Sequence, residues 1–164
     1  MFTFLKLKLL YKALQRYLVF ARGKYGALEM FVTFGGVGHL KPASGTWGSL
    51  AALPFAVLIR FFFGPWVLLM AAVALYFVAA GAVYWYEKKS GTHDGSEIVM
   101  DEVIGMMIAL IPAPLSFWHV AIAFVAFRAF DAFKPGPIGW IDTQMPGAHG
   151  VLLDDVLAGI AAAV

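Results

Sequence analysis

The stretch that decides the fold covers residues 127–142 and reads F-R-A-F-D-A-F-K-P-G-P-I-G-W-I-D. It closes a long apolar run and places Arg128, Asp131 and Lys134 three residues apart. On a helix such residues lie about 60° apart around the axis, so the charges share one face and Asp131 can pair with either cation. The two prolines of K-P-G-P then end the helix. The pattern predicts a rigid helix end that suits a phosphate, although an Arg–Asp pair alone is equally typical of a simple interfacial salt bridge.

The composition indicates an integral membrane protein. Hydrophobic residues make up 62% of the 164 positions and charged residues only 13%, whereas soluble domains average about 45–50% and 25%. The absence of cysteine excludes disulfides, zinc–thiolate sites and a cysteine nucleophile. Carboxylates, hydroxyls, histidines and a bound metal remain for chemistry, and we expect no nucleic-acid partner.

Basic residues are concentrated at the start of the chain. Six of the twelve lysines and arginines lie in the first 24 positions, where they interrupt the apolar residues. A secretory signal needs an uninterrupted apolar core and a small-residue cleavage site, and the segment has neither. We therefore predict that residues 1–30 form a basic, amphipathic arm lying on an anionic cytoplasmic leaflet, and that residues 31–164 form a membrane-embedded catalytic domain.

The apolar segments predict two helical hairpins. Residues 50–63 and 65–86 are separated by Gly-Pro, and the run at 103–127 is broken in its middle by Pro112 and Pro114. Each hairpin returns the chain to the side it left, which Lys88 and Lys89 mark as cytoplasmic. The predicted fold is an all-α, polytopic membrane bundle with short or broken transmembrane helices, an N-terminal interfacial helix, and a last apolar helix near residue 150.

A glycine-rich segment precedes the first hairpin. Residues 33–50 contain five glycines, which we interpret as a tight loop feeding a helix. Thr46 or Ser49 can cap that helix, and the free backbone N–H groups at its start suit an anion. The segment lacks both nucleotide-binding glycine motifs, so it does not indicate a nucleotide.

The predicted topology gathers the acidic residues at one membrane face. Carboxylate pairs without thiols or a histidine cluster are ligands for a hard cation, and Mg²⁺ is favoured because it takes few carboxylates and keeps water for a phosphorylated substrate. Single pairs are as typical of helix capping, so the convergence carries the argument. The predicted metal ligands are Asp101, Glu102, Asp131, Asp154 and Asp155.

Cations near these carboxylates complete the predicted site. Arg128 and Lys134 are expected to bind phosphate and to stabilise the transition state. Thr46, Ser49 and the loop residue His93 are grouped with them as substrate-binding residues, and His93 and His149 are expected to form hydrogen bonds rather than to ligate a metal. Together the residues predict phosphoryl chemistry on a lipid head group.

These motifs resemble a known family. F-R-A-F-D-A-F-K-P-G-P-I resembles the FR-x-x-D-x-x-KP-x-PI signature of phosphatidylglycerophosphatase A, a magnesium-dependent bacterial membrane enzyme. The blocks G-T-W-G-S-L, I-V-M-D-E-V-I-G and G-V-L-L-D-D-V-L-A-G occur in the family's order. The resemblance implies hydrolysis of phosphatidylglycerophosphate to phosphatidylglycerol and phosphate, in a multi-pass protein of the bacterial inner membrane with its site facing the cytoplasm. It leaves open whether water or an aspartate attacks phosphorus.

Two other functions share some of these sequence features. A CDP-alcohol phosphatidyltransferase is also small, helical and metal-dependent, but its D-G-x-x-A-R motif is not matched, because Asp94-Gly95 is followed by Ser-Glu-Ile-Val. A cation or proton transporter would spread its carboxylates through the membrane depth, whereas here they cluster at predicted helix ends.

Overall fold

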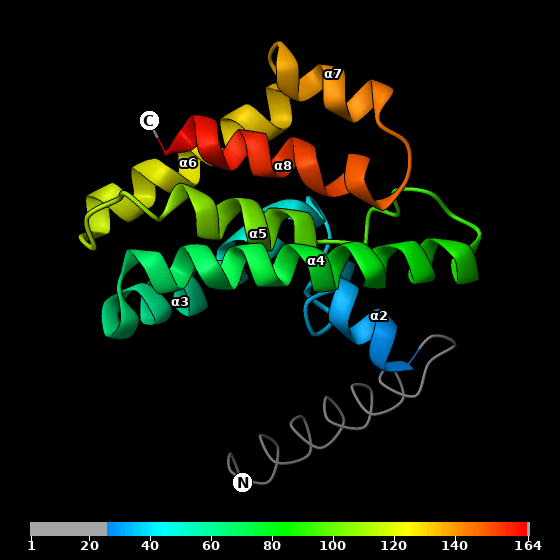
Figure 1. Cartoon of the computed structure of the whole chain (residues 1–164), viewed down its shortest axis with the longest axis horizontal. Helices are drawn as coiled ribbons and strands as arrows, with labels where there is room; N and C mark the ends of the chain where they lie inside the picture. Colours follow the sequence, from blue (N-terminus) through cyan, green and yellow to red (C-terminus); the bar gives the residue numbers. More distant parts are fainter. Residues whose placement is uncertain (1–25, 164) are drawn as a thin grey trace, which may run out of the picture.

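A computed structural model of the chain describes residues 26–163. Within that range the chain forms seven α-helices, one short 3-10 helix and no strands (Figure 1), so the all-α prediction is confirmed. The predicted amphipathic arm lies outside the described residues, apart from its last five positions. The elements are α2 (Gly26–Val32), η1 (Val37–His39), α3 (Ser44–Phe63), α4 (Pro65–Ser90), α5 (Met100–Ala109), α6 (Phe117–Phe133), α7 (Pro137–Gln144) and α8 (Ala148–Ala162).

The first hairpin forms as predicted, from α3 and α4. Gly64 makes the turn with φ +86°, a conformation that glycine adopts without steric cost, and Pro65 occupies the first position of α4, where its missing N–H is not needed. In Figure 1 the two helices lie side by side, below α5, α6 and α8.

The start of α3 corrects the predicted loop. The helix begins at Ser44, after Ala43, with no side-chain cap, so the prediction that Thr46 or Ser49 caps it was wrong. The glycines there serve close packing rather than a turn. A Cβ on Gly48 would approach Val99 Cβ to 2.7 Å, and one on Gly45 would collide with the Glu102 carboxylate. Both glycines therefore lie inside α3, at positions where only glycine fits beside the start of α5.

The short helix α5 is the centre of the bundle. It packs against α3, α4, α6 and α8, and eight of its ten residues are buried. A bend of residues 110–116, which contains Pro112 and Pro114, separates it from α6, so the predicted break is confirmed. Ten residues extend roughly 15 Å, about half of the hydrocarbon core of a bilayer.

The K-P-G-P stretch ends α6 as predicted, but it also starts a helix that the sequence analysis missed. Helix α6 stops at Phe133, and Lys134 takes a left-handed conformation with φ +44°. Pro137 then begins α7, because proline is well suited to the first turn of a helix. Helix α8 follows and packs against α5, α6 and α7.

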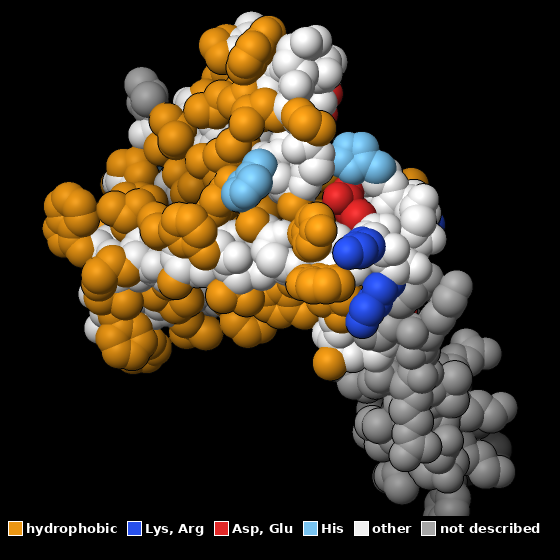
Figure 2. Space-filling view, turned by 45° about the vertical axis from the view of Figure 1, so that its right-hand side comes forward, with side chains coloured by type: hydrophobic (Ala, Val, Ile, Leu, Met, Phe, Trp, Pro, Cys, Tyr) orange, Lys and Arg blue, Asp and Glu red, His pale blue; other side chains and the backbone are white. Residues whose placement is uncertain are grey.

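The outer surface is apolar, and charge is confined mainly to one end. Helices α3 and α4 are long and apolar enough to cross a membrane. Large side chains such as Phe61, Trp66, Phe77, Phe117 and Trp118 are more than two-thirds exposed. Figure 2 shows hydrophobic side chains over most of one face, with acidic and basic side chains gathered toward one edge. An exposed apolar surface of this extent is expected to contact lipid.

Candidate active site

A cavity of about 260 Å³ lies at the charged end of the bundle. Its walls come from the start of α3, the loop after α4, the first turn of α5, the end of α6, and helices α7 and α8. Nearly half of its lining residues carry a carboxylate. The charged and histidine side chains that line it are His93, Asp94, Asp101, Glu102, Asp131, Lys134, Asp142, Asp154 and Asp155.

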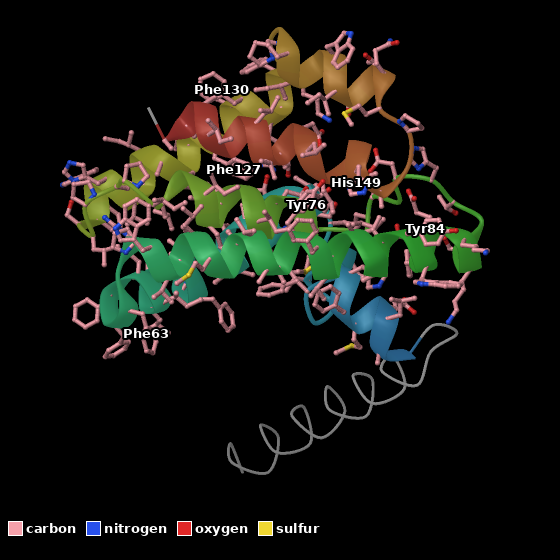
Figure 3. The ribbon with its side chains drawn as sticks, in the orientation of Figure 1. Phe63, Tyr76, Tyr84, Phe127, Phe130 and His149 are labelled. Carbon is pink, nitrogen blue, oxygen red and sulfur yellow. The ribbon has the colours of Figure 1, made fainter. Side chains whose placement is uncertain are left out.

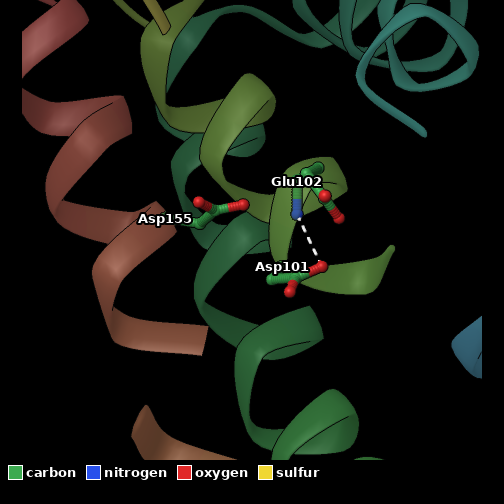
Figure 4. A group of neighbouring side chains, drawn as sticks. All are labelled: Asp101, Glu102 and Asp155. Carbon is green, nitrogen blue, oxygen red and sulfur yellow. Dashed lines mark hydrogen bonds between the residues drawn. The ribbon is translucent and has the colours of Figure 1, made fainter. Parts of the chain in front are cut away.

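Three carboxylates form the centre of this cavity (Figure 4). Asp101 and Glu102 stand in the first turn of α5, and Asp155 projects from α8 toward them. One carboxylate oxygen from each lies within 4.8 Å of the others, and Asp101 and Asp155 are 9% and 3% exposed. Helix capping accounts for acids in the first turn of α5, but it does not explain Asp155, which lies within α8.

The donor set fits a hard divalent cation. Three carboxylates at this spacing repel one another unless a positive charge lies between them. The Glu102 Oε2 and Asp154 Oδ1 atoms are buried and have no hydrogen-bond partner within residues 26–163, and buried polar atoms are rarely left unpaired. Oxygen ligands without sulfur or imidazole are those that Mg²⁺ or Ca²⁺ takes. The structure thus contains an acidic cluster able to bind a divalent metal.

Two cations flank the carboxylates, each held by its own acids. The Arg128 guanidinium donates a hydrogen bond to Asp131 Oδ2 and lies 4.0 Å from Glu102 Oε1. Lys134 does not follow the predicted common face. Because its left-handed backbone takes it off the helix, it reaches Asp142 on α7 and donates to Asp154 Oδ2 at 2.7 Å.

The ion pairs keep Lys134 charged. Burial by itself lowers the pKa of this lysine, but the hydrogen bonds and negative charges of Asp142 and Asp154 outweigh burial, so the pKa is raised above its usual value. Lys134 is therefore a permanent cation in the cavity wall at neutral pH.

A loop across the cavity is fixed by Glu87. Its carboxylate oxygen Oε1 lies 2.6 Å from His93 Nδ1 and accepts a hydrogen bond from the Asp94 backbone N–H at 2.9 Å. The Ser44 hydroxyl at the start of α3 donates to the Ser96 carbonyl at 2.5 Å. These contacts hold the loop of residues 91–97 against α3 and α4, with His93 in the cavity lining, as the sequence analysis expected for a hydrogen-bonding histidine.

Most of the predicted site residues meet in this cavity, and three do not line it. Arg128 lies behind Asp131 and Glu102. Ser49 is fully buried and donates to the Gly45 carbonyl at 2.8 Å, and Thr46 is also absent from the lining among the described residues. Substrate binding by these three stays a prediction from sequence.

Asp142 and Ser44 are cavity residues that the sequence analysis missed. The contact of Asp142 with Lys134 could not be predicted from spacing, because Asp142 lies eight positions further along the chain. Only the turn into α7 brings the two side chains together. Ser44 was not predicted as a site residue because it lies in the glycine-rich segment that was interpreted as a tight loop feeding a helix.

The fold and cavity define a class of protein: a helical chain with apolar outer faces and, at one end, an acidic cavity able to hold a divalent cation. A family model described as Phosphatidylglycerophosphatase A matches residues 30–164. The chain belongs to this family, as its motifs predicted.

Curated relatives agree with this assignment. Phosphatidylglycerophosphatase A of Escherichia coli K12 is 43% identical over 122 residues, covering 73% of this chain and 69% of the relative. The protein of the same name from Haemophilus influenzae is 35% identical over 130 residues, covering 79% and 80%. A Bacteroides thetaiotaomicron protein, provisionally named a phosphatidylinositol-3-phosphatase, is 34% identical over 131 residues, covering 76% and 82%. No solved structure matches the chain.

Proposed function

We propose that this chain hydrolyses the terminal phosphate of phosphatidylglycerophosphate, giving phosphatidylglycerol and inorganic phosphate. The observation that carries the proposal is the carboxylate cluster of Asp101, Glu102 and Asp155, which shares one cavity with the cation Lys134 at the polar end of an apolar surface. A lipid whose head group ends in a phosphate monoester matches both parts of this surface. Membership of the phosphatidylglycerophosphatase A family supports the same reaction.

The proposed cofactor is Mg²⁺, held by Asp101, Glu102 and Asp155. Bound there, Mg²⁺ would supply positive charge to the phosphate oxygens that gain charge in the transition state. Asp131 and Asp154 line the same cavity and stay in the proposed ligand set, each also oriented by its own cation.

The basic residues have separate proposed roles. Lys134 binds a phosphate oxygen, sharing its ammonium between the substrate and Asp154. Arg128 stabilises the phosphate through the two carboxylates beside it, because its Nη1 donates to Asp131 and lies 4.0 Å from Glu102. In the balanced reaction the phosphorus–oxygen bond to the glycerol breaks, water supplies the new oxygen on phosphorus, and a proton passes to the leaving alkoxide.

We further propose a multi-pass arrangement with the cavity facing the cytoplasm. Lys88 and Lys89 end α4 beside the loop that closes the cavity, and positive residues next to membrane spans favour the cytoplasmic side. On this proposal residues 31–164 form the membrane-embedded catalytic domain, and residues 1–30 form a basic arm at the same interface.

Phosphate release from a panel of lipids tests the proposed substrate. The purified protein in detergent with Mg²⁺ is given phosphatidylglycerophosphate, phosphatidic acid or phosphatidylinositol 3-phosphate. We expect phosphatidylglycerophosphate to be preferred by at least about tenfold in kcat/KM, which corresponds to roughly 1.4 kcal/mol, the scale of one net hydrogen bond. Preference for the inositol lipid would assign the chain the other activity named among its relatives. Asp155→Asn serves as the control for contaminating phosphatases.

A further inference from the structure

A second cavity, distinct from the acidic one, is an apolar groove of about 210 Å³ between α4, α5 and α8. Five of its lining residues come from α4, two from α5 and two from α8. Tyr76 is the one lining residue with a polar side chain. The lining residues are Leu69, Ala72, Val73, Tyr76, Phe77, Ile104, Ile108, Leu153 and Val156.

The groove and the acidic cavity are built from the same two helices. Ile104 lies one turn after Asp101 on α5, and Val156 follows Asp155 on α8. Along α4 the groove runs from Leu69 to Phe77, which at 1.5 Å per residue is roughly 12 Å. The groove therefore lies one to two helical turns along α5 from Asp101, and along α4 it extends away from the charged end.

A polar pair marks the end of the groove nearest the acidic cavity. The Tyr76 hydroxyl lies 2.7 Å from His149 Nδ1, and Figure 3 shows the two side chains facing one another between α4 and the start of α8. The other end has only aliphatic and aromatic walls. Such a gradient from polar to apolar matches a phospholipid, whose ester groups join a head group to hydrocarbon.

We propose that this groove holds one acyl chain of the phospholipid substrate while the phosphate occupies the acidic cavity. The inference rests on the proposed function. Val73 and Phe77 at the rim are 49% and 68% exposed, so the groove opens onto the surface that faces lipid. Because bilayer hydrocarbon is as apolar as the groove, the groove gains little from burial. Its effect is to orient the lipid so that the phosphate meets the carboxylates.

Filling the groove tests this role. Val73→Trp places an indole in the groove, and Val78→Trp makes the same change at an exposed position of α4 outside the lining. Each variant is assayed on dioleoyl phosphatidylglycerophosphate and on its water-soluble, deacylated head group. Val73→Trp should lower kcat/KM for the lipid by roughly tenfold or more and leave the head group unaffected, while Val78→Trp changes neither.

Loss on both substrates, or equal effects of the two variants, would overturn the groove proposal. No phosphate release from the lipid by the parent protein would instead overturn the proposed function, so the two failures are distinguishable.

Photolabelling tests occupancy without turnover. Vesicles contain a non-hydrolysable phosphonate analogue of phosphatidylglycerophosphate, or phosphatidylcholine, each with a photoreactive acyl chain, and labelled residues are located by mass spectrometry. We expect the phosphonate to label groove residues several-fold more than phosphatidylcholine does, and Val73→Trp to remove that excess. Equal labelling by both lipids would show bulk lipid in the groove, and cross-links between two copies of the chain would show a protein interface. Either result would contradict the proposal.

Discussion

Glu102 connects the parts of the site at the scale of single residues. Its backbone N–H donates to Asp101 Oδ1 at 3.0 Å, and its Oε1 lies 4.0 Å from the Arg128 guanidinium. Gly45 packs so closely behind it that a Cβ there would collide with the carboxylate. One Glu102 oxygen remains buried without a partner in the described part of the chain. The surroundings thus fix the carboxylate while leaving an oxygen for a ligand.

The first prediction concerns Asp155→Asn, which keeps the size of the side chain and removes its charge. Phosphate release should fall on the order of 10³-fold, since a preorganised charge in a buried site is lost. Mg²⁺ should raise the Tm of the parent protein, because a ligand that binds the folded state stabilises it, and the variant should lose most of this rise. An unchanged rise in Tm with Mg²⁺ would remove Asp155 from the ligand set.

A second prediction separates positioning by Arg128 from simple charge. Arg128→Lys keeps the positive charge but replaces the planar guanidinium, whose Nη1 donates to Asp131 and lies 4.0 Å from Glu102, by an ammonium of different shape. We expect kcat to fall roughly 10²-fold and the Mg²⁺ concentration for half-maximal activity to rise, because two proposed ligands lose their orientation. If only KM for the lipid changes, Arg128 contacts the phosphate directly, as the sequence analysis predicted, and does not act through the carboxylates.

At the scale of elements, the site depends on how closely α5 and α8 approach. Gly105 allows this contact, because a Cβ there would lie 2.7 Å from both the Asp155 carbonyl oxygen and Phe127 Cζ. A Cβ on Gly159 of α8 would likewise collide with the Gly105 carbonyl oxygen. Asp101 and Asp155 therefore belong to one cluster because two glycines let their helices touch.

Gly105→Ala is the third prediction. It should destabilise the protein by about 1–3 kcal/mol through overpacking and weaken Mg²⁺ binding by moving Asp155 away from Asp101. Gly81→Ala on α4 is the matched control, because a Cβ there meets nothing within 4 Å and alanine favours the helix by up to about 1 kcal/mol. Thermal unfolding with and without Mg²⁺ measures both effects, and equal behaviour of the two variants would contradict the close-packing argument.

Helix breaks were predictable from sequence, whereas close packing was not. Gly64-Pro65 and Pro112 ended helices as expected because their backbone preferences are local. The glycines near Gly45 suggested a loop, but they lie within α3. Their lack of a side chain allows α3 to pack closely against α5. Likewise, the acidic cluster followed from topology, while the contact of Asp142 with Lys134 depends on an unpredicted left-handed turn.

At the scale of the whole molecule, the charged groups and the exposed apolar surface occupy different regions. The acidic cavity, Lys88 and Lys89 lie at one end, whereas the turns at Gly64 and at residues 110–116 lie at the other (Figure 1). At that other end Arg60 donates two hydrogen bonds to the Ala113 carbonyl at 3.0 and 2.8 Å, which provides a partner for a charged side chain set among apolar residues.

The fourth prediction concerns orientation. The chain has no native cysteine, so single cysteines at the exposed positions Thr92, Thr143 and Ser116 report accessibility without background. Thr92 and Thr143 should react with a membrane-impermeant thiol reagent only from the cytoplasmic side, and Ser116 only from the opposite side. Labelling of Thr92 from outside would place the cavity away from the cytoplasm.

The most direct test of the central claim is the metal dependence of phosphate release from phosphatidylglycerophosphate by the purified parent protein. If Asp101, Glu102 and Asp155 act together through Mg²⁺, chelation with EDTA should abolish release, and added Mg²⁺ should restore it in the parent but not in Asp155→Asn. Release that continues unchanged in EDTA, or that is equally fast in Asp155→Asn, would contradict the account.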